Sequence, residues 1–272
     1  MNLFDGRALA DQVLKETKGL MGDKKLSLGI FVVGEDPVSA KFVAQKEKVG
    51  KELGVDVRQY ALASKLSTTK MRVRIGDLAK QTKHDGFILQ LPLPEGINTQ
   101  YVLNAIPEDR DVDCLNQKSI GAFVVGRLKI VPPVVGAVST LLESQNILLE
   151  NKKIVLVGMG RLVGRPMALW LIAQDLPFMS LTYQSPDLLA LSEADIIISG
   201  AGQAGLLKGS MFKDGAIVID AGTSEVGGKL MGDVDAASCQ DKSGWLAPVP
   251  GGVGPLTVAH IFKNLATLTG NG

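Results

Sequence analysis

The chain has 272 residues, of which 46% are hydrophobic, and its 29 basic side chains nearly balance 28 acidic ones. This length allows two modest domains or one large one, and a net charge of +1 gives no reason to expect nucleic acid as the main partner. Cys114 and Cys239 are isolated and only two histidines occur, so neither a disulfide framework, a metal site nor a Ser-His-Asp hydrolase is indicated. There is no leader pattern and no apolar run of about eighteen residues, so we expect a cytoplasmic protein with no membrane partner.

The first half predicts helices alternating with buried strands. Short apolar runs closed by glycine or proline suit strands of a parallel sheet that are buried on both faces. Helices are expected over 6–21, 35–54, a stretch around 71–78 and 99–105, and strands over 26–34, 56–62 and 86–94.

One lysine lies on the apolar face of the helix expected over 35–54. At about 100° per residue, Phe42, Lys46, Val49 and Leu53 form one stripe, whereas the other lysines of the helix point elsewhere. Either the stem of Lys46 is buried with its ammonium in water, or the amine is partly desolvated and its pKa is lowered, as in acid–base lysines.

Two further polar features stand out in this half. Gln90 interrupts an apolar run at the carboxyl end of a strand, where open α/β sheets bind ligands; a hydrogen-bonded edge residue is the alternative. Asp111 and Asp113 share one face if their segment is extended. A solvated acidic loop is the default interpretation of this pair, and spacing alone supports only weakly a binding role for Asp113.

The second half predicts a doubly wound parallel sheet. Residues 118–133 are expected to be irregular, and a helix is expected over 134–142. A strand over 153–157, a glycine-rich turn over 158–164 and a helix over 165–173 then place a helix N-terminus where a dinucleotide pyrophosphate could lie. Strands over 178–183, 196–199, 216–220 and 245–249 complete the pattern. No acidic residue ends the strand over 178–183, so the usual partner of an NAD ribose is missing.

The segment 247–257, Ala-Pro-Val-Pro-Gly-Gly-Val-Gly-Pro-Leu-Thr, joins the last strand to a terminal helix. Its prolines fix the backbone, and its glycines permit positive φ and close approach of a ligand. Pro255 is expected to be the first helical residue. The segment is either a rigid corner or a nest of N–H groups at residues 251–254 for an anion or carbonyl.

Several stretches together resemble the bifunctional methylenetetrahydrofolate dehydrogenase/methenyltetrahydrofolate cyclohydrolase family of the FolD type. The most specific are Gly-Phe-Ile-Leu-Gln-Leu-Pro-Leu from Gly86, Ile-Pro at 106–107 with Asp-Val-Asp at 111–113, Gly-Ala-Ile-Val-Ile-Asp from Gly215, and the segment 248–257. The resemblance implies an α/β fold with two domains around a cleft. Residues 1–130 with 256–272 would form the catalytic folate-binding domain, and residues 131–255 a Rossmann-like dinucleotide domain.

The resemblance also implies roles for matching residues. Lys46 would handle proton transfer when water opens the methenyl ring, Gln90 would orient Lys46, and Asp113 would bind N–H groups of the pterin. The implied substrate-binding positions are Phe42, Leu91, Pro92, Pro250, Gly251, Gly252 and Pro255. The implied cofactor-binding positions are Gly158, Gly160, Arg161, Leu162, Val163, Gly164, Ser185, Gly222 and Thr223. Tetrahydrofolate derivatives, NADP and a second copy in a homodimer are the implied partners, in one-carbon metabolism that serves purine, methionine and histidine biosynthesis.

Four positions depart from the family pattern. Phe42 replaces the usual Tyr, so a ring can still stack but a hydroxyl is lost, and Cys114 replaces the usual Gly. Val-Pro-Pro-Val at 131–134 replaces the usual Pro-Cys/Ala-Thr-Pro. Met159 stands where the family has the arginine that contacts the NADP 2′-phosphate, with Arg161 or Arg165 as possible substitutes. NADP is the expected cofactor and NAD is the alternative.

The expected activity is oxidation of 5,10-methylenetetrahydrofolate followed by hydrolysis of the methenyl product to 10-formyltetrahydrofolate. Two alternatives stay open: a dehydrogenase of the same architecture with another substrate, and a homologue that binds folate or nucleotide without turnover. The glycines of 250–254 are expected to keep side chains away from the place where folate and nicotinamide meet, with close packing favoured over an anion nest. Gly252→Val is therefore expected to reduce turnover more than folding.

Overall fold

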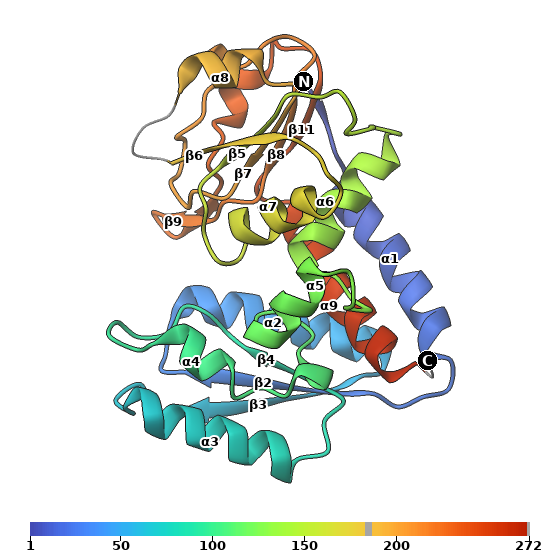
Figure 1. Ribbon diagram of the computed structural model, residues 1–272, viewed down its shortest axis with the longest axis vertical. Coiled ribbons are helices and arrows are strands. Elements are labelled where there is room, and N and C mark those ends of the chain that lie inside the picture. Colours follow the sequence, from blue (N-terminus) through green and yellow to red (C-terminus); the bar gives the residue numbers. More distant parts are fainter. Residues whose placement is uncertain (183–186, 271–272) are drawn as a thin grey trace. The chain divides into compact units, whose positions relative to one another are not determined.

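The computed structural model describes residues 1–182 and 187–270 (Figure 1). The chain divides into two compact units, each with a parallel sheet, which confirms the α/β prediction. We call them the three-strand unit, residues 12–133 with those from Val258 onward, and the six-strand unit, residues 1–11 with 134–257.

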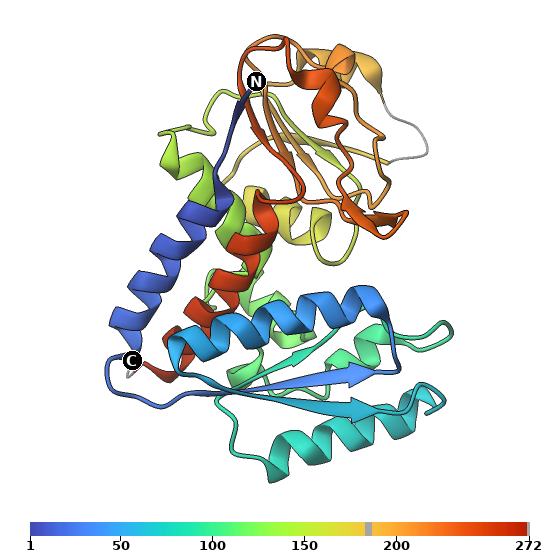
Figure 2. The same ribbon diagram turned by 180° about the vertical axis from the view of Figure 1, so that it is seen from behind.

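The three-strand unit is built around β2 (Ser27–Val33), which lies between β3 (Asp56–Leu62) and β4 (Gly86–Leu89), all parallel. Its helices are α2 (Pro37–Leu53), α3 (Thr68–Gln81), α4 (Thr99–Leu103) and α5 (Gln117–Val124), with a 3₁₀ turn η1 (Glu108–Arg110). Figures 1 and 2 show α2 and α3 on opposite faces of this sheet. Parallel neighbours require such crossover helices, so the topology follows from the strand direction.

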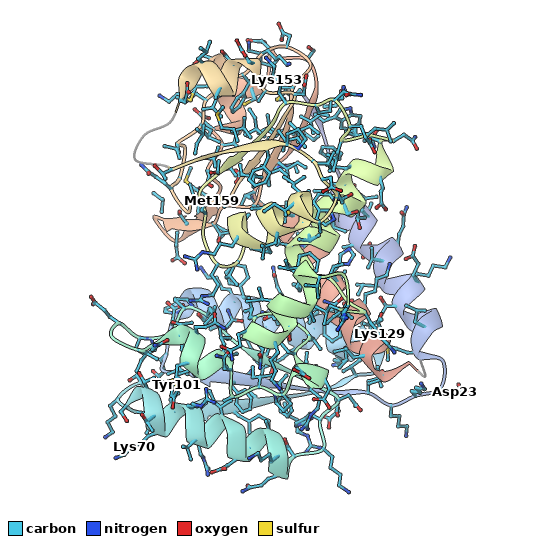
Figure 3. The ribbon with its side chains drawn as sticks, in the orientation of Figure 1. Asp23, Lys70, Tyr101, Lys129, Lys153 and Met159 are labelled. Atoms are coloured by element: carbon cyan, nitrogen blue, oxygen red, sulfur yellow. The ribbon has the colours of Figure 1, made fainter. Side chains whose placement is uncertain are left out.

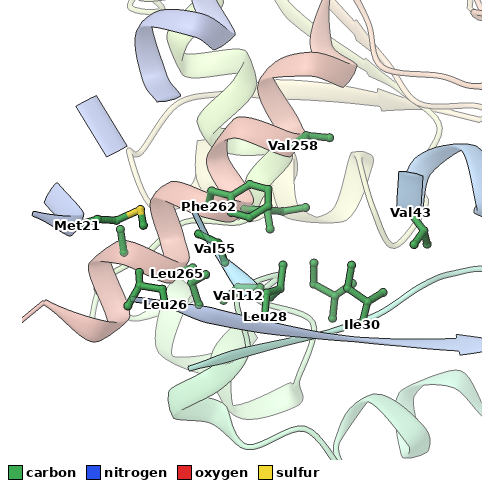
Figure 4. Close-up of a cluster of buried hydrophobic side chains, with 13 residues drawn as sticks. Met21, Leu26, Leu28, Ile30, Val43, Val55, Val112, Val258, Phe262 and Leu265 are labelled. Carbon is green, nitrogen blue, oxygen red and sulfur yellow. The ribbon is translucent and has the colours of Figure 1, made fainter. Parts of the chain in front are cut away.

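Alternate residues of β2 supply the two cores of this unit. Leu28 and Ile30 point to the face covered by α2 and by the later part of α9 (Val253–Thr269), where Phe262 and Leu265 pack on them (Figure 4). Phe31 points to the other face and packs with Met71 of α3 and with further residues. Each such side chain stabilises the fold by about 1.5–3 kcal/mol when fully buried.

Helix α2 has well-defined ends. The Asp36 carboxylate accepts a hydrogen bond of 2.8 Å from the Ser39 N–H, and Gly54 ends the helix at a φ of 76°. A side chain at Gly50 would lie 2.3 Å from Val57 Cγ2, so the glycine lets the helix pack closely on β3. These contacts fix the rotation of α2 and thus the direction in which Lys46 points.

The six-strand unit contains β1 (Asn2–Leu3), β5 (Ile154–Val157), β6 (Phe178–Leu181), β7 (Ile196–Ser199), β8 (Ile217–Asp220) and β11 (Trp245–Ala247). In the order β6-β5-β7-β8-β11-β1, all neighbouring strands are parallel. The chain adds β6 on one side of β5 and then continues with β7 on the other side, so the strand order reverses between β5 and β7. This is the doubly wound arrangement, in which ligands bind beyond the carboxyl ends of the strands at the point of reversal. The connections between the strands contain helices α6 (Pro133–Ser144), α7 (Gly164–Ile172) and α8 (Leu188–Glu193). They also contain a hairpin of β9 (Ser224–Val226) and β10 (Lys229–Met231), and 3₁₀ turns η2 (Gly209–Met211) and η3 (Ala236–Cys239).

Strand β4 ends at Leu89 and not at residue 94, and three further features differ from the sequence prediction. Strand β1 pairs with β11, so residues 1–11, which continue into α1 (Gly6–Met21), belong to the six-strand unit rather than to the first domain. Residues 117–124 form α5 and are not irregular, because Asn116 caps the helix by accepting the Lys118 N–H. Helix α9 begins at Val253, and Pro255 lies in its first turn, where an N–H has no helical partner.

None of the helices within the described ranges is both long enough and apolar enough to span a membrane.

Candidate active site

Lys46 and Gln90 meet inside the three-strand unit. Lys46 is 8% exposed and its Nζ donates a hydrogen bond of 2.8 Å to Gln90 Oε1. The alternative of a buried stem with its ammonium in water is therefore wrong. Burial lowers the pKa of the Lys46 amine, and the negative charge of Asp113 opposes part of this shift. An amine with a lowered pKa can give up and recover a proton under cellular conditions.

The amide of Gln90 is held in one orientation. Gln90 follows the last residue of β4, and its main-chain N–H donates to Phe31 O at 2.9 Å. Its Nε2 donates to Leu91 O at 2.9 Å, which leaves Oε1 facing the lysine. Because a lysine amine offers protons and Nε2 cannot accept them, only this orientation satisfies both groups.

Asp113 supplies the second charge of the site. Burial raises the pKa of Asp113 to about 6; the Lys46 charge opposes this shift and Asp111 adds to it. The side chain is half-buried, and no group in the described part of the chain donates a hydrogen bond to its carboxylate. The site therefore holds a carboxylate with unused acceptor capacity close to a buried amine.

The loop that carries Asp113 is folded on itself and is not a solvated acidic loop. Asp111 is 1% exposed, forms an isolated parallel bridge with Phe87 beside β4, and accepts the Asn116 N–H at 2.7 Å. Cys114 lies between them at a φ of 57°, a conformation that glycine adopts more readily than other residues. Burial raises the pKa of the Cys114 thiol well above its usual range. Asp111 thus shapes the loop, whereas the Asp113 carboxylate accepts no hydrogen bond from the described residues.

Sequence reasoning did not find Asn264, which is buried on α9. Its Nδ2 donates to Val112 O at 2.9 Å and to Val131 O at 2.8 Å, so one amide ties two loops of the three-strand unit together. The signal was available, because Asn264 interrupts an apolar helix face as Lys46 does.

The three expected substrate positions near Lys46 lie in the same unit. Phe42 is half-buried and precedes Lys46 by one turn of α2, while Leu91 and Pro92 directly follow Gln90. Leu91 is half-buried and Pro92 is exposed, so this end of β4 presents apolar surface beside the polar pair. Such a combination suits a flat heterocyclic ligand.

The expected cofactor turn lies between β5 and α7 in the six-strand unit. Gly158 has a φ of 83°, and a side chain there would lie 2.7 Å from Ala201 Cα. A side chain at Gly164 would lie 1.9 Å from Gly158 O, so the helix begins in contact with the end of the strand. The turn is therefore a backbone cradle that only glycines permit, and it fits a dinucleotide pyrophosphate at the N-terminus of α7.

The side chains of this turn are mostly basic or apolar. Arg165 Nε donates to Met159 O at 3.2 Å, and Met159 marks the turn in Figure 3. Burial is the main cause that lowers the pKa of the Arg161 guanidinium, and the charge of Arg165 is the second. The two positive side chains therefore lie near each other. Leu162 is exposed, Val163 immediately precedes α7, and Gly160 is exposed. Ser185, also expected to bind the cofactor, lies outside the described residues.

Two buried aspartates lie beside the other expected cofactor positions. Asp233 was not found from the sequence, and Asp220 was noted there only as the last residue of a family motif. Gly222 and Thr223 follow β8, and the Gly222 N–H donates to Asp220 at 3.0 Å. Asp220 is 1% exposed and Asp233 is 0% exposed. Burial raises the pKa of Asp220 to about 7. Thr223 is exposed and open to a ligand.

The segment 248–255 lies in the six-strand unit and is a packed corner. Gly251 has a φ of 109°, and the Gly252 N–H donates to Pro248 O at 2.8 Å, so this N–H is not available for an anion nest. A side chain at Gly252 would lie 2.7 Å from Pro248 O. Gly252→Val would strain the backbone, contrary to the expectation that it reduces turnover more than folding. Pro250 is exposed and Pro255 is half-buried.

A buried lysine–amide pair at the carboxyl edge of one parallel sheet, and a glycine cradle at the reversal point of another, define a two-domain α/β enzyme of the dinucleotide-dependent class. The family model "Tetrahydrofolate dehydrogenase/cyclohydrolase, catalytic domain" matches residues 4–113, and the model "Tetrahydrofolate dehydrogenase/cyclohydrolase, NAD(P)-binding domain" matches residues 132–271. The chain belongs to the tetrahydrofolate dehydrogenase/cyclohydrolase family, as its sequence resemblance predicted.

Individual relatives agree with this assignment over nearly the full length. The chain is 36% identical over 269 residues to the bifunctional protein FolD of Moorella thermoacetica, with 96% of each chain covered. It is similar to the crystal structure of the FolD enzyme of Campylobacter jejuni, with a TM-score of 0.90, 33% identity and 98% of each chain covered. The FolD structure of Trypanosoma brucei complexed with NADP cofactor and inhibitor matches with a TM-score of 0.90, 29% identity, and 98% and 96% coverage.

Proposed function

We propose that this enzyme oxidises 5,10-methylenetetrahydrofolate to the 5,10-methenyl compound with NADP and hydrolyses that product to 10-formyltetrahydrofolate. The observation that carries the proposal is the buried Lys46 amine, 2.8 Å from Gln90 Oε1 and close to the Asp113 carboxylate. Membership of the family supports the pairing of the two reactions.

In the hydrolytic step, water adds to the methenyl carbon, one carbon–nitrogen bond of the ring breaks, and one proton is released. Lys46 takes the proton from the attacking water and returns one to the departing nitrogen. Gln90 keeps the amine in place, because Leu91 O fixes its amide and Oε1 accepts from Nζ. Its desolvated position lowers the pKa of Lys46, so the amine can act as a base.

Asp113 recognises the heterocycle in this proposal. Its carboxylate has acceptor capacity that the described residues leave unused, which suits the amino and ring N–H groups of a pterin. Phe42 lies one helical turn from Lys46, where its ring can stack on the ligand, and Leu91 and Pro92 add apolar contact.

Bound NADP would supply the acceptor for the hydride that leaves the methylene carbon. The chain's contribution to this step is binding and orientation: the cradle of Gly158, Gly160 and Gly164 would hold the pyrophosphate, and Gly222 and Thr223 are further positions that would hold the cofactor. Pro250, Gly251, Gly252 and Pro255 are the further substrate-binding positions of this proposal.

The choice of NADP rests on two arginines in this proposal. Met159 has no charge for a 2′-phosphate, but Arg161 and Arg165 flank the same turn, and the charge of Arg165 contributes to the lowered pKa of Arg161. A steady-state comparison of kcat/KM for NADP and NAD tests this assignment. A charged hydrogen bond to the phosphate should favour NADP by about ten- to a hundredfold, from about 1.5–3 kcal/mol; equal values would overturn it.

A homodimer is also proposed, on the basis of the exposed apolar edge of the six-strand unit. Strand β6 ends that sheet and its Met179 is 49% exposed, while Ile172 of α7 is 54% exposed. Sedimentation analysis should give twice the monomer mass of 28.8 kDa, and a mass of one chain would contradict the proposal. A cytoplasmic location is consistent with the proposed substrates, and tagging the protein in cells tests it.

The activity assay also decides between this function and the alternatives. Formation of the methenyl compound with NADP or NAD, followed by its hydrolysis, supports the proposed function. Absence of turnover with folate bound would favour a non-catalytic homologue, and absence of folate binding would favour another substrate. The intact Lys46–Gln90 hydrogen bond speaks for catalysis.

A further inference from the structure

The carboxylate of Asp233 is the centre of a hydrogen-bond cluster within the six-strand unit. It is 0% exposed and accepts three hydrogen bonds: from Ser199 Oγ at 2.6 Å, from the Ala201 N–H at 2.7 Å and from the Gln203 N–H at 2.7 Å. Oδ2 takes the first two and Oδ1 takes the third. Both oxygens therefore hold the same short loop, residues 200–203, directly after β7.

This loop lies at the point where the strand order reverses. The sheet runs β6-β5-β7-β8, so the loops that follow β5 and β7 border the place where doubly wound sheets bind their ligand. The two loops touch: a side chain at Gly158 would lie 2.7 Å from Ala201 Cα, and one at Gly200 would lie 2.4 Å from Val163 Cβ. The backbone of residues 200–203 is thus one side of the glycine cradle.

A second carboxylate holds Asp233 itself. Asp220, at the end of β8, accepts the N–H groups of Asp233 at 3.1 Å and Val234 at 2.8 Å. Side chains at Gly222 and Gly232 would come within 2.1 Å of Asp233 and 2.0 Å of Asp220, respectively, so both glycines make room for these carboxylates. The Asp235 N–H and Asp233 O also pair with Leu207, which continues the attachment of this segment.

We propose that Asp233 is a positioning residue that holds the loop 200–203 in the shape that binds the dinucleotide. The proposal rests on the proposed function, namely that the six-strand unit binds NADP. A carboxylate is needed because all three of its partners are donors; an asparagine would turn an NH₂ group toward at least one of them. Removal of one partner of a buried hydrogen bond to a charged group leaves donors unsatisfied, and here those donors belong to the binding loop.

Asp233→Asn tests the proposal with two readouts on one protein. We expect the dissociation constant of NADP, measured by calorimetry, to rise by about tenfold or more. Hydrolysis of supplied methenyltetrahydrofolate, which needs Lys46 of the other unit, should stay within about twofold of the parent. An unchanged NADP affinity would overturn the proposal, and so would a parallel loss of hydrolysis, because that would indicate a general role in folding.

Asp235→Asn is the matched control. Asp235 lies two residues away and caps the turn η3 through the Ser238 N–H, without a bond to the loop 200–203. Its affinity for NADP should stay within about twofold of the parent value, and an equal loss in both variants would overturn the specific role of Asp233.

Ser199→Ala keeps the test decisive if Asp233→Asn does not fold. It removes the 2.6 Å bond but leaves both N–H bonds to Asp233, so we expect a loss of NADP affinity of a few fold with full hydrolysis. No loss would contradict the proposal. If the parent protein itself bound neither NADP nor NAD, the proposed function would be contradicted. If the parent and the variant bound NADP equally well, only the role of Asp233 would be contradicted.

Discussion

The two units each bury a cluster of polar groups at the carboxyl edge of a parallel sheet, but the clusters are satisfied in different ways. Burial raises a carboxyl pKa in both, to about 6 at Asp113 and to about 7 at Asp220. Main-chain N–H groups surround Asp220 and Asp233. Lys46 donates one hydrogen bond in the described part of the chain, although an ammonium can make three.

This difference distinguishes polar residues that can act on a ligand from polar residues that stabilise the fold. A buried polar group whose partners all come from its own chain stiffens the fold, whereas one with unused capacity can serve a ligand. Variants of the first kind should change stability or loop shape, and variants of the second kind should change turnover. The following predictions test that separation, from the largest expected effect to the smallest.

Lys46→Met should reduce hydrolysis of methenyltetrahydrofolate by about 10²–10⁴-fold, the range for loss of a positioned acid–base group. Methionine fills similar volume without a charge, so thermal unfolding should change little. Lys48→Met is the control, because Lys48 lies on the same helix with its side chain 78% exposed. Undiminished hydrolysis in Lys46→Met would show that the amine is not the proton carrier.

Asp220→Asn should act on stability. Asp220 accepts three main-chain N–H groups, and asparagine would turn an NH₂ group toward at least one of them, which should lower the free energy of unfolding by about 1–3 kcal/mol. The pKa of about 7 in the folded state lies above the ordinary value of about 4, so the folded state binds this proton more tightly. The contribution of Asp220 to stability is therefore fully present below about pH 4 and is lost as pH rises through about 7.

Denaturant titrations between pH 4 and pH 8 measure this effect as the difference between parent and variant. The parent should lose stability relative to Asp220→Asn as the pH rises. A constant difference across this range would mean that Asp220 does not titrate there in the folded protein.

Asp113→Asn should weaken folate binding by about ten- to a hundredfold, the cost of one charged hydrogen bond. In the parent, binding should strengthen as pH rises through about 6, because the carboxylate forms there, and should level off above that value. Fluorescence titration with a non-reactive folate at pH 5–8 checks both statements. Asp109→Asn changes an exposed acid of the same loop and should bind like the parent; an identical pH profile in Asp113→Asn would contradict the assignment.

Met159→Arg should have the smallest effect, on cofactor preference only. An added guanidinium in the turn should raise the ratio of kcat/KM for NADP over NAD by about tenfold or less, because Arg161 and Arg165 already supply positive charge there. Hydrolysis serves as the internal control and should not change. A large gain would show instead that neither of these arginines contacts the phosphate.

The sequence predicted the elements whose signal is local. The ends of α1, β3 and β7 follow directly from apolar periodicity, and Lys46 was found because a charge on an apolar helix face is unusual. Gln90 was found in the same way, as a polar break in a buried strand. Both residues meet as the resemblance implied.

What the sequence did not reveal depends on distant partners. A two-residue strand such as β1 has no period, and its place is set by pairing with β11 at the other end of the chain. Asp233 gains its three donors from residues about thirty positions earlier, and Gly-Asp-Val-Asp at 232–235 alone looks like a solvated turn. The same holds for Asp111, whose burial comes from its bridge beside β4.

The most direct test of the account is to supply Lys46→Met with 5,10-methylenetetrahydrofolate and NADP and to follow the folate products with time. If the lysine cluster performs hydrolysis and the six-strand unit binds the cofactor independently, NADPH should form and the methenyl compound should accumulate in equal amount, while 10-formyltetrahydrofolate appears only slowly. Rapid appearance of 10-formyltetrahydrofolate would contradict the role of Lys46. Failure to form NADPH would contradict the separation of the two clusters.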